Sequence, residues 1–320
     1  MNILYRGALA IPLFIACGAF AQSYPHKPIR LVLPYPPGGG TDVIARPLAQ
    51  KLTETLGQQV IVDNRGGANG NIGMEFVAKS PPDGYTLLFA LTAQYAINPS
   101  LYPKLPYDTV KDYAPISLLA NAPYLLVVHP SMPAKSTSEL IALMKTRPGQ
   151  LAYSSSGNGS GAHLAGEMFR SLAKVEMAHV PYKGAGPAMP DLIAGQVQLS
   201  FVTYTAAGPH IKTGRLRALG VTTAKRSPTL PDLPAIAETI PGYDSAVWYG
   251  FAAPAGTPSD IIARLNSEVL RVLAAPDFRN RITLEAVAPI GTTPEEFGNF
   301  MKTEIVRWAK VVRESGARVD

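Results

Sequence analysis

The amino-acid sequence predicts an α/β fold built as two lobes of similar design, and three observations support this. Short apolar runs typical of buried strands alternate with segments whose apolar residues recur every three or four positions. A strand, a glycine-rich loop and a helix follow one another twice, at residues 29–56 and 151–172. The chain has 320 residues, 47% hydrophobic and 16% charged, which is about enough for two cores.

The first strand–loop–helix unit begins with an apolar strand at residues 29–34, which ends in a run of prolines and glycines. The following helix is indicated by apolar residues at every fourth position and is closed by Gly57. Pro47 falls inside that helix, so we expect a bend or an irregular start. Residues 60–62 and 85–90 are typical of further buried strands, with a second helix opened by residues 66–73.

The second unit has a strand at residues 151–154 and a Gly/Ser loop at residues 155–161. The helix after this loop is expected to bury an apolar face, formed by Leu164, Met168 and Leu172. Further strands are predicted at residues 178–181 and 199–203, with a helix between them that includes residues 189–193.

Two helices are indicated in the last third of the chain. Thr257 and Pro258 are expected to supply the cap and first turn of one helix. The other begins at a capping box formed by Thr293 and Glu296, and Gly316 ends it. Their apolar stripes indicate packing against a core, with one formed by Ile261, Leu265, Val269 and Leu273 and the other by Phe297, Met301, Ile305, Trp308 and Val312.

Residues 1–21 are typical of a secretory signal peptide. Arg6 precedes an apolar stretch at residues 8–20, and Ala19-Phe20-Ala21 predicts cleavage after Ala21. The stretch is shorter than the ~20 residues that span a bilayer, which disfavours the alternative of a permanent anchor. The only cysteine, Cys17, lies inside this segment, in a context that fits lipid attachment poorly. We therefore expect a periplasmic chain whose mature form has neither thiol chemistry nor cysteine-bound metal.

The charge and residue pattern of the chain limit the classes of partner that it can bind. A net charge of +6 and a pI near 9.3 favour anionic small molecules. No cluster of Lys and Arg and no base-stacking motif is present in the sequence, so we expect no nucleic-acid partner. The five histidines are scattered and form no His-Glu-x-x-His pattern, so neither a metal site nor a cofactor is expected.

The loop after the first strand is a candidate anion site. Glycines let a ligand approach the backbone, and free amides at a helix N-terminus attract negative charge. The alternative is an ordinary tight turn with a helix capped by Thr41 or Asp42. Residues 35–42 and 153–163 contain no Lys or Arg, which favours a carboxylate over a phosphate. The candidate ligand-binding residues here are Tyr35, Gly39, Gly40, Thr41 and Asp42.

The loop of the second unit offers hydroxyl and backbone donors. It is no dinucleotide fingerprint, because the third glycine is replaced by Ala162, and it has no nucleophile elbow around Ser160. His163 is either a ligand contact or a local hydrogen-bonding residue. Tyr204 is a candidate because it follows a predicted strand of the second lobe, where α/β folds place ligand contacts. The candidate ligand-binding residues in this unit and outside both loops are Ser156, Gly157, Ser160, Gly161, His163, Thr92 and Tyr204.

Motifs spread over residues 24–258 resemble the Bug family of extracytoplasmic solute receptors, the binding subunits of tripartite tricarboxylate transporters. The residues that carry this resemblance are Tyr24-Pro25-x-x-Pro28-Ile29-Arg30, Pro37-Gly38-Gly39-Gly40-Thr41-Asp42, Asn64-Arg65-Gly66-Gly67-Ala68, Pro82-Asp83-Gly84-Tyr85-Thr86-Leu87-Leu88, Tyr182-Lys183-Gly184, Gly214-Arg215-Leu216-Arg217-Ala218-Leu219, Leu230-Pro231-Asp232-Leu233-Pro234 and Trp248-Tyr249-Gly250-Phe251-Ala252-Ala253-Pro254-Ala255-Gly256-Thr257-Pro258.

The resemblance implies a two-lobed, type II-like periplasmic binding protein with two sheets flanked by helices and hinge crossovers near residues 121–124 and 243–248. Lobe 1 would comprise residues 22–122 and 246–320, and lobe 2 residues 123–245. It further implies a non-enzymatic, monomeric receptor that binds a small carboxylate and meets membrane permease subunits. Many relatives have an acidic residue where this chain has Val202-Thr203-Tyr204-Thr205, which puts an amine-bearing ligand in doubt.

Two other functions fit parts of the sequence. A secreted hydrolase would use a serine such as Ser160, although no Ser–His–Asp pattern is recognisable. A sensor that reports its ligand to a membrane kinase would use the same lobes as an uptake receptor.

Overall fold

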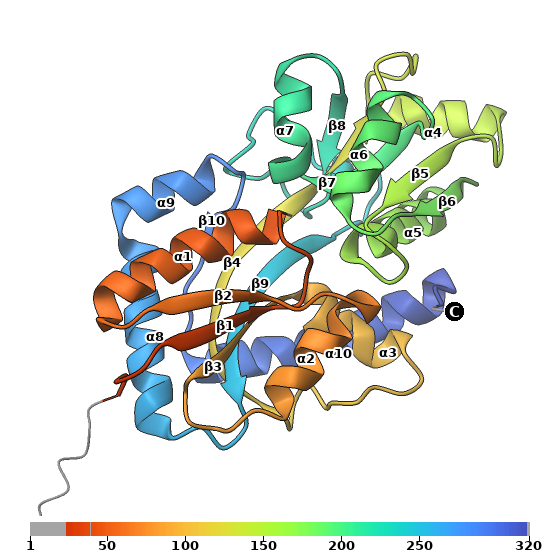
Figure 1. Ribbon diagram of the computed structural model, residues 1–320. Helices are drawn as coiled ribbons and strands as arrows, with labels where there is room; N and C mark the ends of the chain where they lie inside the picture. The colour runs from red at the N-terminus through yellow and green to blue at the C-terminus, as the bar shows by residue number, and fades with distance from the viewer. Residues whose placement is uncertain (1–23, 39, 319–320) are drawn as a thin grey trace, which may run out of the picture.

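The computed structural model describes residues 24–38 and 40–318. Its strands follow the order β2-β1-β3-β9-β4-β7-β5-β6 in one curled sheet, and β8 and β10 also pair with β4 (Figure 1). The strands are β1 (Ile29–Leu33), β2 (Val60–Asn64), β3 (Thr86–Leu91), β4 (Tyr113–Val128), β5 (Ala152–Ser155), β6 (Ala178–Pro181), β7 (Leu199–Thr203), β8 (Arg217–Val221), β9 (Ala246–Pro254) and β10 (Ala288–Pro289).

The long strand β4 joins the two ends of the sheet. Its residues 113–123 pair antiparallel with β9, whereas residues 124–128 pair with β7 and β8. On one side, which we call the β1 end, β1 pairs parallel with β2 and β3. On the other, the β6 end, β5 pairs parallel with β6 and β7. The predicted α/β class is confirmed, and both strand–loop–helix units are present.

Helices cover both faces of the sheet. They are α1 (Gly40–Leu56), α2 (Asn71–Ala78), α3 (Asn98–Leu101), α4 (Thr137–Thr146), α5 (Gly161–Ala173), α6 (Ala185–Ile193), α7 (Tyr204–Lys212), α8 (Ser259–Ala274), α9 (Pro276–Thr283) and α10 (Pro294–Ser315). Short helical turns lie at Ala68–Gly70, Ala93–Ile97 and Ile236–Glu238.

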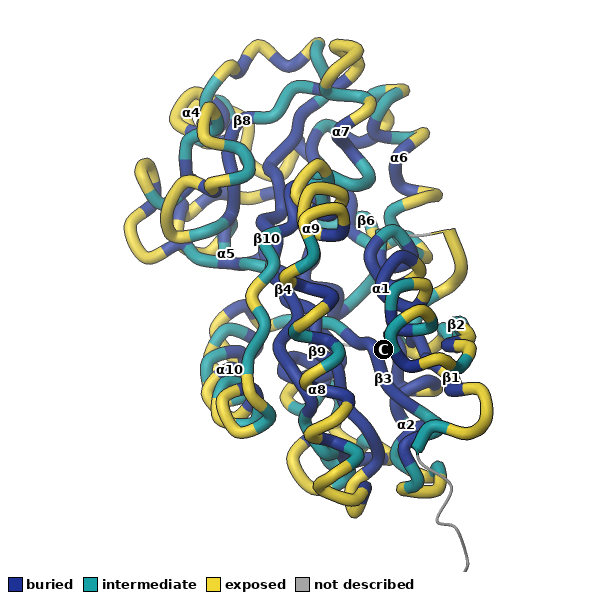
Figure 2. Tube along the Cα trace, turned by 90° about the vertical axis from the view of Figure 1, so that its left-hand side faces the viewer, coloured by how far each residue is buried: buried dark blue, intermediate teal, exposed yellow. Residues whose placement is uncertain are grey.

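Alternate residues of β1 enter different cores, which explains the continuous apolar run of this strand. Leu31 and Leu33 pack in the core that includes α1 and α8. Val32 packs in the core that includes α2 and α10. Figure 2 shows the central strands β1, β3, β4 and β9 as a buried band, with exposed residues on the outer turns of the helices.

Some details differ from the sequence predictions. Helix α1 already begins at Gly40, so Thr41 and Asp42 lie inside its first turn and neither is its cap. The same helix continues through Pro47 to Leu56, because Pro47 costs a single internal hydrogen bond while the apolar stripe stays buried. In α5, Leu172 is 43% exposed, and Phe169 is the large residue of the buried face together with Leu164.

The two C-terminal helices are present, but they begin differently. Pro258 is the N-cap of α8, and no side chain caps that helix; the Thr257 hydroxyl instead donates to the Pro254 carbonyl at 2.7 Å. The capping box of α10 is confirmed, with the Thr293 hydroxyl accepting from the Glu296 amide at 3.2 Å. Gly316 ends α10 in the left-handed region.

The predicted signal peptide and cleavage site lie outside the described residues, as does Gly39. Within residues 24–38 and 40–318, no helix is long and apolar enough to cross a membrane.

Candidate functional site

The starts of α1 and α7 meet beside a pair of residues on neighbouring strands. Tyr124 of β4 lies directly opposite Thr203 at the carboxyl end of β7. The Thr203 and Thr205 hydroxyls are hydrogen-bonded at 2.7 Å. A Cβ atom added at Gly40 would lie only 2.6 Å from Thr205 Oγ1. The absence of a side chain at Gly40 therefore lets the N-terminus of α1 approach that of α7.

The start of α5 reaches the same place. The Ser160 hydroxyl caps this helix by accepting from the His163 amide at 3.2 Å. The amides of Gly161 and Ala162 precede the first intrahelical hydrogen bond and have no partner among the described residues. The Tyr124 hydroxyl packs against Gly161, where a Cβ atom would clash with it. Three helix N-termini thus surround Tyr124 and Thr203.

Asp42 braces the first loop. Its carboxylate accepts from the Gly38 amide at 2.9 Å and is paired with Arg46 at 2.7 Å. The Asn64 side chain links Asp42 to the Tyr35 carbonyl, donating to the latter at 3.1 Å. Because Asp42 is 6% exposed and already neutralised by Arg46, it shapes the loop for a ligand without offering a free negative charge.

His163 braces the second loop in a similar way. Its Nδ1 atom accepts from the Gly159 amide at 3.0 Å, so the neutral ring carries its proton on Nε2. The ring stacks on His179 with centroids 4.0 Å apart. Burial lowers the pKa of His163, and burial together with His163 lowers that of His179 to about 3. Both rings are neutral, so neither supplies a cation to an anionic ligand.

The two loop regions touch across the junction between the ends of the sheet. Asn69, before α2 at the β1 end, donates through Nδ2 to the Gly159 carbonyl of the β6 end at 3.2 Å. The same Nδ2 donates to Asn98 Oδ1 at 2.9 Å. The structure therefore holds the two ends in contact around the helix N-termini.

The remaining predicted residues divide into two groups. Tyr35, Ser156 and Gly157 form the group near the site. The Tyr35 hydroxyl accepts from Gln94 at 2.7 Å, and Tyr35 is close enough to Tyr124 to raise its pKa. Ser156 and Gly157 are half-buried in the loop before α5. Thr92, by contrast, is 1% exposed and its hydroxyl accepts from the Trp248 amide at 2.8 Å, joining β3 to β9. The Tyr204 ring packs on Gly208 of its own helix.

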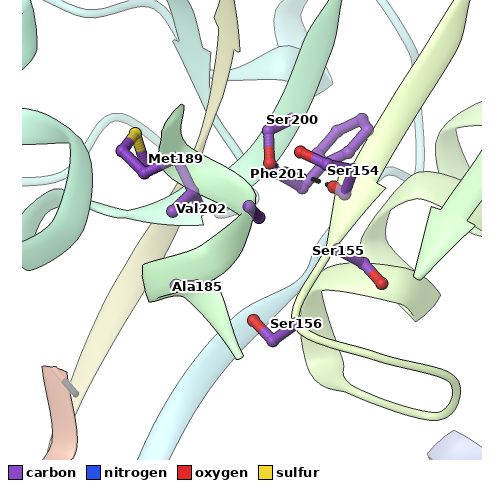
Figure 3. Close-up of a pocket in the computed structure, with 9 residues that line it drawn as sticks. Ser154, Ser155, Ser156, Ala185, Met189, Ser200, Phe201 and Val202 are labelled. Carbon is purple, nitrogen blue, oxygen red and sulfur yellow. Dashed lines mark hydrogen bonds between the residues drawn. The ribbon is translucent and has the colours of Figure 1, made fainter. Parts of the chain in front are cut away.

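A small cavity lies under the second loop (Figure 3). Ser154, Ser155 and Ser156 line one side of it, with β7 and α6 on the other, and Ser200 Oγ donates to the Ser154 carbonyl at 3.0 Å. Its volume of about 10 Å³ has room for one water-sized molecule, so an organic acid does not fit there. The helix N-termini, and not this cavity, are the candidate acid site.

Ser155 and His179 form the serine–histidine contact that a hydrolase would need, with Oγ and Nε2 2.7 Å apart. Ser155 is only 2% exposed, and within the described ranges no carboxylate is hydrogen-bonded to His179. Ser160, the serine considered from the sequence, is instead occupied as the cap of α5.

Sequence reasoning missed Tyr124, Thr203 and Asn69 as members of this site. Tyr124 lies inside a long apolar strand, and no local sequence pattern predicts that it contacts Gly161. The departure at residues 202–205 from the acidic residue of many relatives did point to the position of Thr203 and Thr205.

The fold and this site define a solute-binding receptor. An R. palustris protein solved with adipate has a TM-score of 0.88 and 38% identity, with 92% of this chain and 100% of that chain covered. MatC from Rhodopseudomonas palustris with bound malate has a TM-score of 0.83 and 32% identity, with 90% and 100% covered. The BugT protein of Bordetella pertussis is 40% identical over 95% of this chain and 94% of its own.

The tripartite tricarboxylate transporter family receptor pattern matches residues 44–317. The chain belongs to this family. Its members are extracytoplasmic substrate-binding receptors and not enzymes, so the resemblance found in the sequence is confirmed and the secreted hydrolase is set aside.

Proposed function

We propose that this protein captures a small organic carboxylate between the β1 end and the β6 end and delivers it to the membrane permease of a tripartite transporter. The observation that carries the proposal is the meeting of three helix N-termini around Tyr124 and Thr203. Free helix amides and hydroxyls can hold a carboxylate without a basic side chain. In the loops at residues 35–38, 40–42 and 153–163 no Lys or Arg is present.

The relatives support this ligand class, since the two R. palustris structures hold adipate and malate. We propose an acid without an ammonium group. An ammonium would need a free carboxylate beside it, whereas Asp42 is paired with Arg46 and hydroxyl residues occupy positions 203 and 205.

The chain would work as two lobes, comprising residues 22–122 with 246–320 and residues 123–245. This division is supported by β4, which exchanges β9 for β7 and β8 as partners between residues 123 and 124. Opening at the crossovers would separate Asn69 from Gly159 and admit the acid, and closing would bury it. The receptor would act as a periplasmic monomer, after cleavage behind Ala21.

The test is a thermal-shift screen of the mature protein with mono-, di- and tricarboxylates, followed by calorimetry. We expect stoichiometric binding of at least one acid and stabilisation that grows with its concentration. Stabilisation by none of the acids would overturn carboxylate capture. Co-purification of the loaded receptor with the permease subunits tests delivery, whereas retention of a membrane kinase in their place would indicate a sensor.

A further inference from the structure

We propose that the Tyr124 hydroxyl is a ligand-binding hydrogen-bond donor to the carboxylate held at the N-terminus of α5. This inference rests on the proposed function and deepens it, because it assigns one side chain to the recognition of the acid.

The geometry of α5 leaves a place for such a ligand. The Ser160 hydroxyl accepts a hydrogen bond from the His163 amide, while the amides of Gly161 and Ala162 have no partner within the described part of the chain. Tyr124 is 92% buried, being 8% exposed, and its hydroxyl packs against Gly161. Among the described residues, this hydroxyl has no hydrogen-bond partner. A buried phenol next to two free amides is satisfied when all three donate to the oxygens of one carboxylate.

The backbone holds Tyr124 in this position. Its amide donates to the Thr222 hydroxyl at 2.8 Å, and that hydroxyl donates to the Tyr124 carbonyl at 3.0 Å. On the other side, Tyr124 is paired with Thr203 at the end of β7. Residues opposite each other in a ladder share one face of the sheet, so Tyr124 projects on the side where Thr203 meets Gly40.

The phenol stays protonated in this environment. Burial, and then the neighbouring Tyr35 and Tyr249, raise the pKa of Tyr124 well above its ordinary value. The hydroxyl is therefore a neutral donor at any physiological pH, which suits a carboxylate and does not repel it. Tyr35 can assist, because its hydroxyl accepts from Gln94 and keeps its own proton free to donate.

The experiment compares two variants that each remove one tyrosine hydroxyl. Tyr124→Phe removes the proposed donor. Tyr95→Phe is the matched control, because the Tyr95 hydroxyl is buried without a partner among the described residues and lies in the core beside Trp248 and Phe297. Binding of acetate, succinate, adipate, malate and citrate is measured by calorimetry on the wild type and on both variants, with unfolding temperature as the check of folding.

We expect Tyr124→Phe to weaken the tightest acid by about 10- to 100-fold, the range for a hydrogen bond to a charged group, and Tyr95→Phe to leave its affinity within about twofold. If Tyr124→Phe unfolds, Tyr124→Leu is used in its place, because it also lacks the hydroxyl and adds no bulk beside Gly161, with the same loss expected. If the wild type and Tyr124→Phe bind an acid equally well, the role of Tyr124 is overturned while the proposed function stands. A wild type that binds none of the five acids overturns the proposed function and this inference together.

Discussion

The side-chain amide of Asn69 donates a 3.2 Å hydrogen bond to the carbonyl oxygen of Gly159, 90 positions further along the chain. This bond connects the loop that precedes α2 with the loop that precedes α5. It is therefore formed only while the β1 end and the β6 end are in contact, and it belongs to the arrangement in which we propose that the acid is enclosed.

Replacing Asn69 tests whether this contact helps to close the receptor. Asn69 has a φ of 50°, so Asn69→Gly removes the side chain while keeping a backbone that glycine adopts readily. Loss of one neutral hydrogen bond that is specific to the closed state should weaken acid binding about three- to tenfold. Calorimetry with the best acid of the screen measures this. Asn280→Ala, at an exposed site on α9, is the control, and equal affinities for both variants would contradict the prediction.

Gly40→Ala tests the close approach of α1 and α7. The new Cβ would lie 2.6 Å from Thr205 Oγ1, so Thr205 must turn and give up its hydrogen bond to Thr203, or the helices must separate. We expect acid affinity to fall by about tenfold, since either change costs on the order of 1.4 kcal/mol. Gly186→Ala on α6 is the control, because its Cβ would meet no atom within 4 Å. An unchanged affinity in Gly40→Ala would show that these helix starts do not act together on the acid.

Glu304 supports the stability of the β1 end. Its buried carboxylate accepts from the indole nitrogens of Trp248 and Trp308, both at 3.0 Å, and it is paired with Arg307 at 3.1 Å. Glu304→Ala leaves two buried N–H groups without an acceptor, so the free energy of unfolding should fall by about 2–4 kcal/mol. Chemical denaturation measures this. Glu314→Ala on the same helix removes a 57% exposed carboxylate 3.9 Å from Lys310 and should change stability by less than about 0.5 kcal/mol.

The parts of the fold that depend on local pattern were predictable from the sequence. The stripe from Ile44 to Leu56 and the box formed by Thr293 and Glu296 contain their own periodicity and capping signals, and both helices are present. Strand β4 was not predicted, because its 16 residues are defined by distant partners on β7, β8 and β9. A local sequence pattern cannot predict pairings with strands so far away in the chain.

The candidate site shows the same limit. Both glycine loops were found because each lies between a strand and a helix, where the chain must turn sharply. The roles within them depend on contacts from elsewhere: Asp42 is engaged by Arg46 and Gly38, and Thr92 by Trp248. Tyr124 became a candidate only through its position beside Gly161, which the pairing of β4 with β7 determines.

The stacked rings of His163 and His179 make stability depend on pH. Burial is the main reason why the pKa of His179 falls to about 3, with His163 as the second cause. In the unfolded chain a histidine titrates near 6.5. Between pH 6.5 and about pH 3, His179 is protonated in the unfolded state but stays neutral in the folded state. The unfolded state therefore binds more protons in this range. The contribution of neutral His179 is therefore complete above pH 6.5 and is lost as the pH falls from 6.5 toward 3.

His179→Gln removes this titration while keeping a side chain that can still bond to the Ser155 hydroxyl, which lies 2.7 Å from the histidine. Many carboxylates also contribute to acid unfolding, so the informative quantity is the difference between wild type and variant at each pH. We expect the free energy of unfolding of the wild type to decline more steeply than that of His179→Gln between pH 6.5 and pH 4, because only the wild type has this extra proton to bind on unfolding. Parallel curves would mean that His179 is already protonated in the folded protein. Proton NMR of its ring, which should show the neutral form at pH 5, checks that point directly.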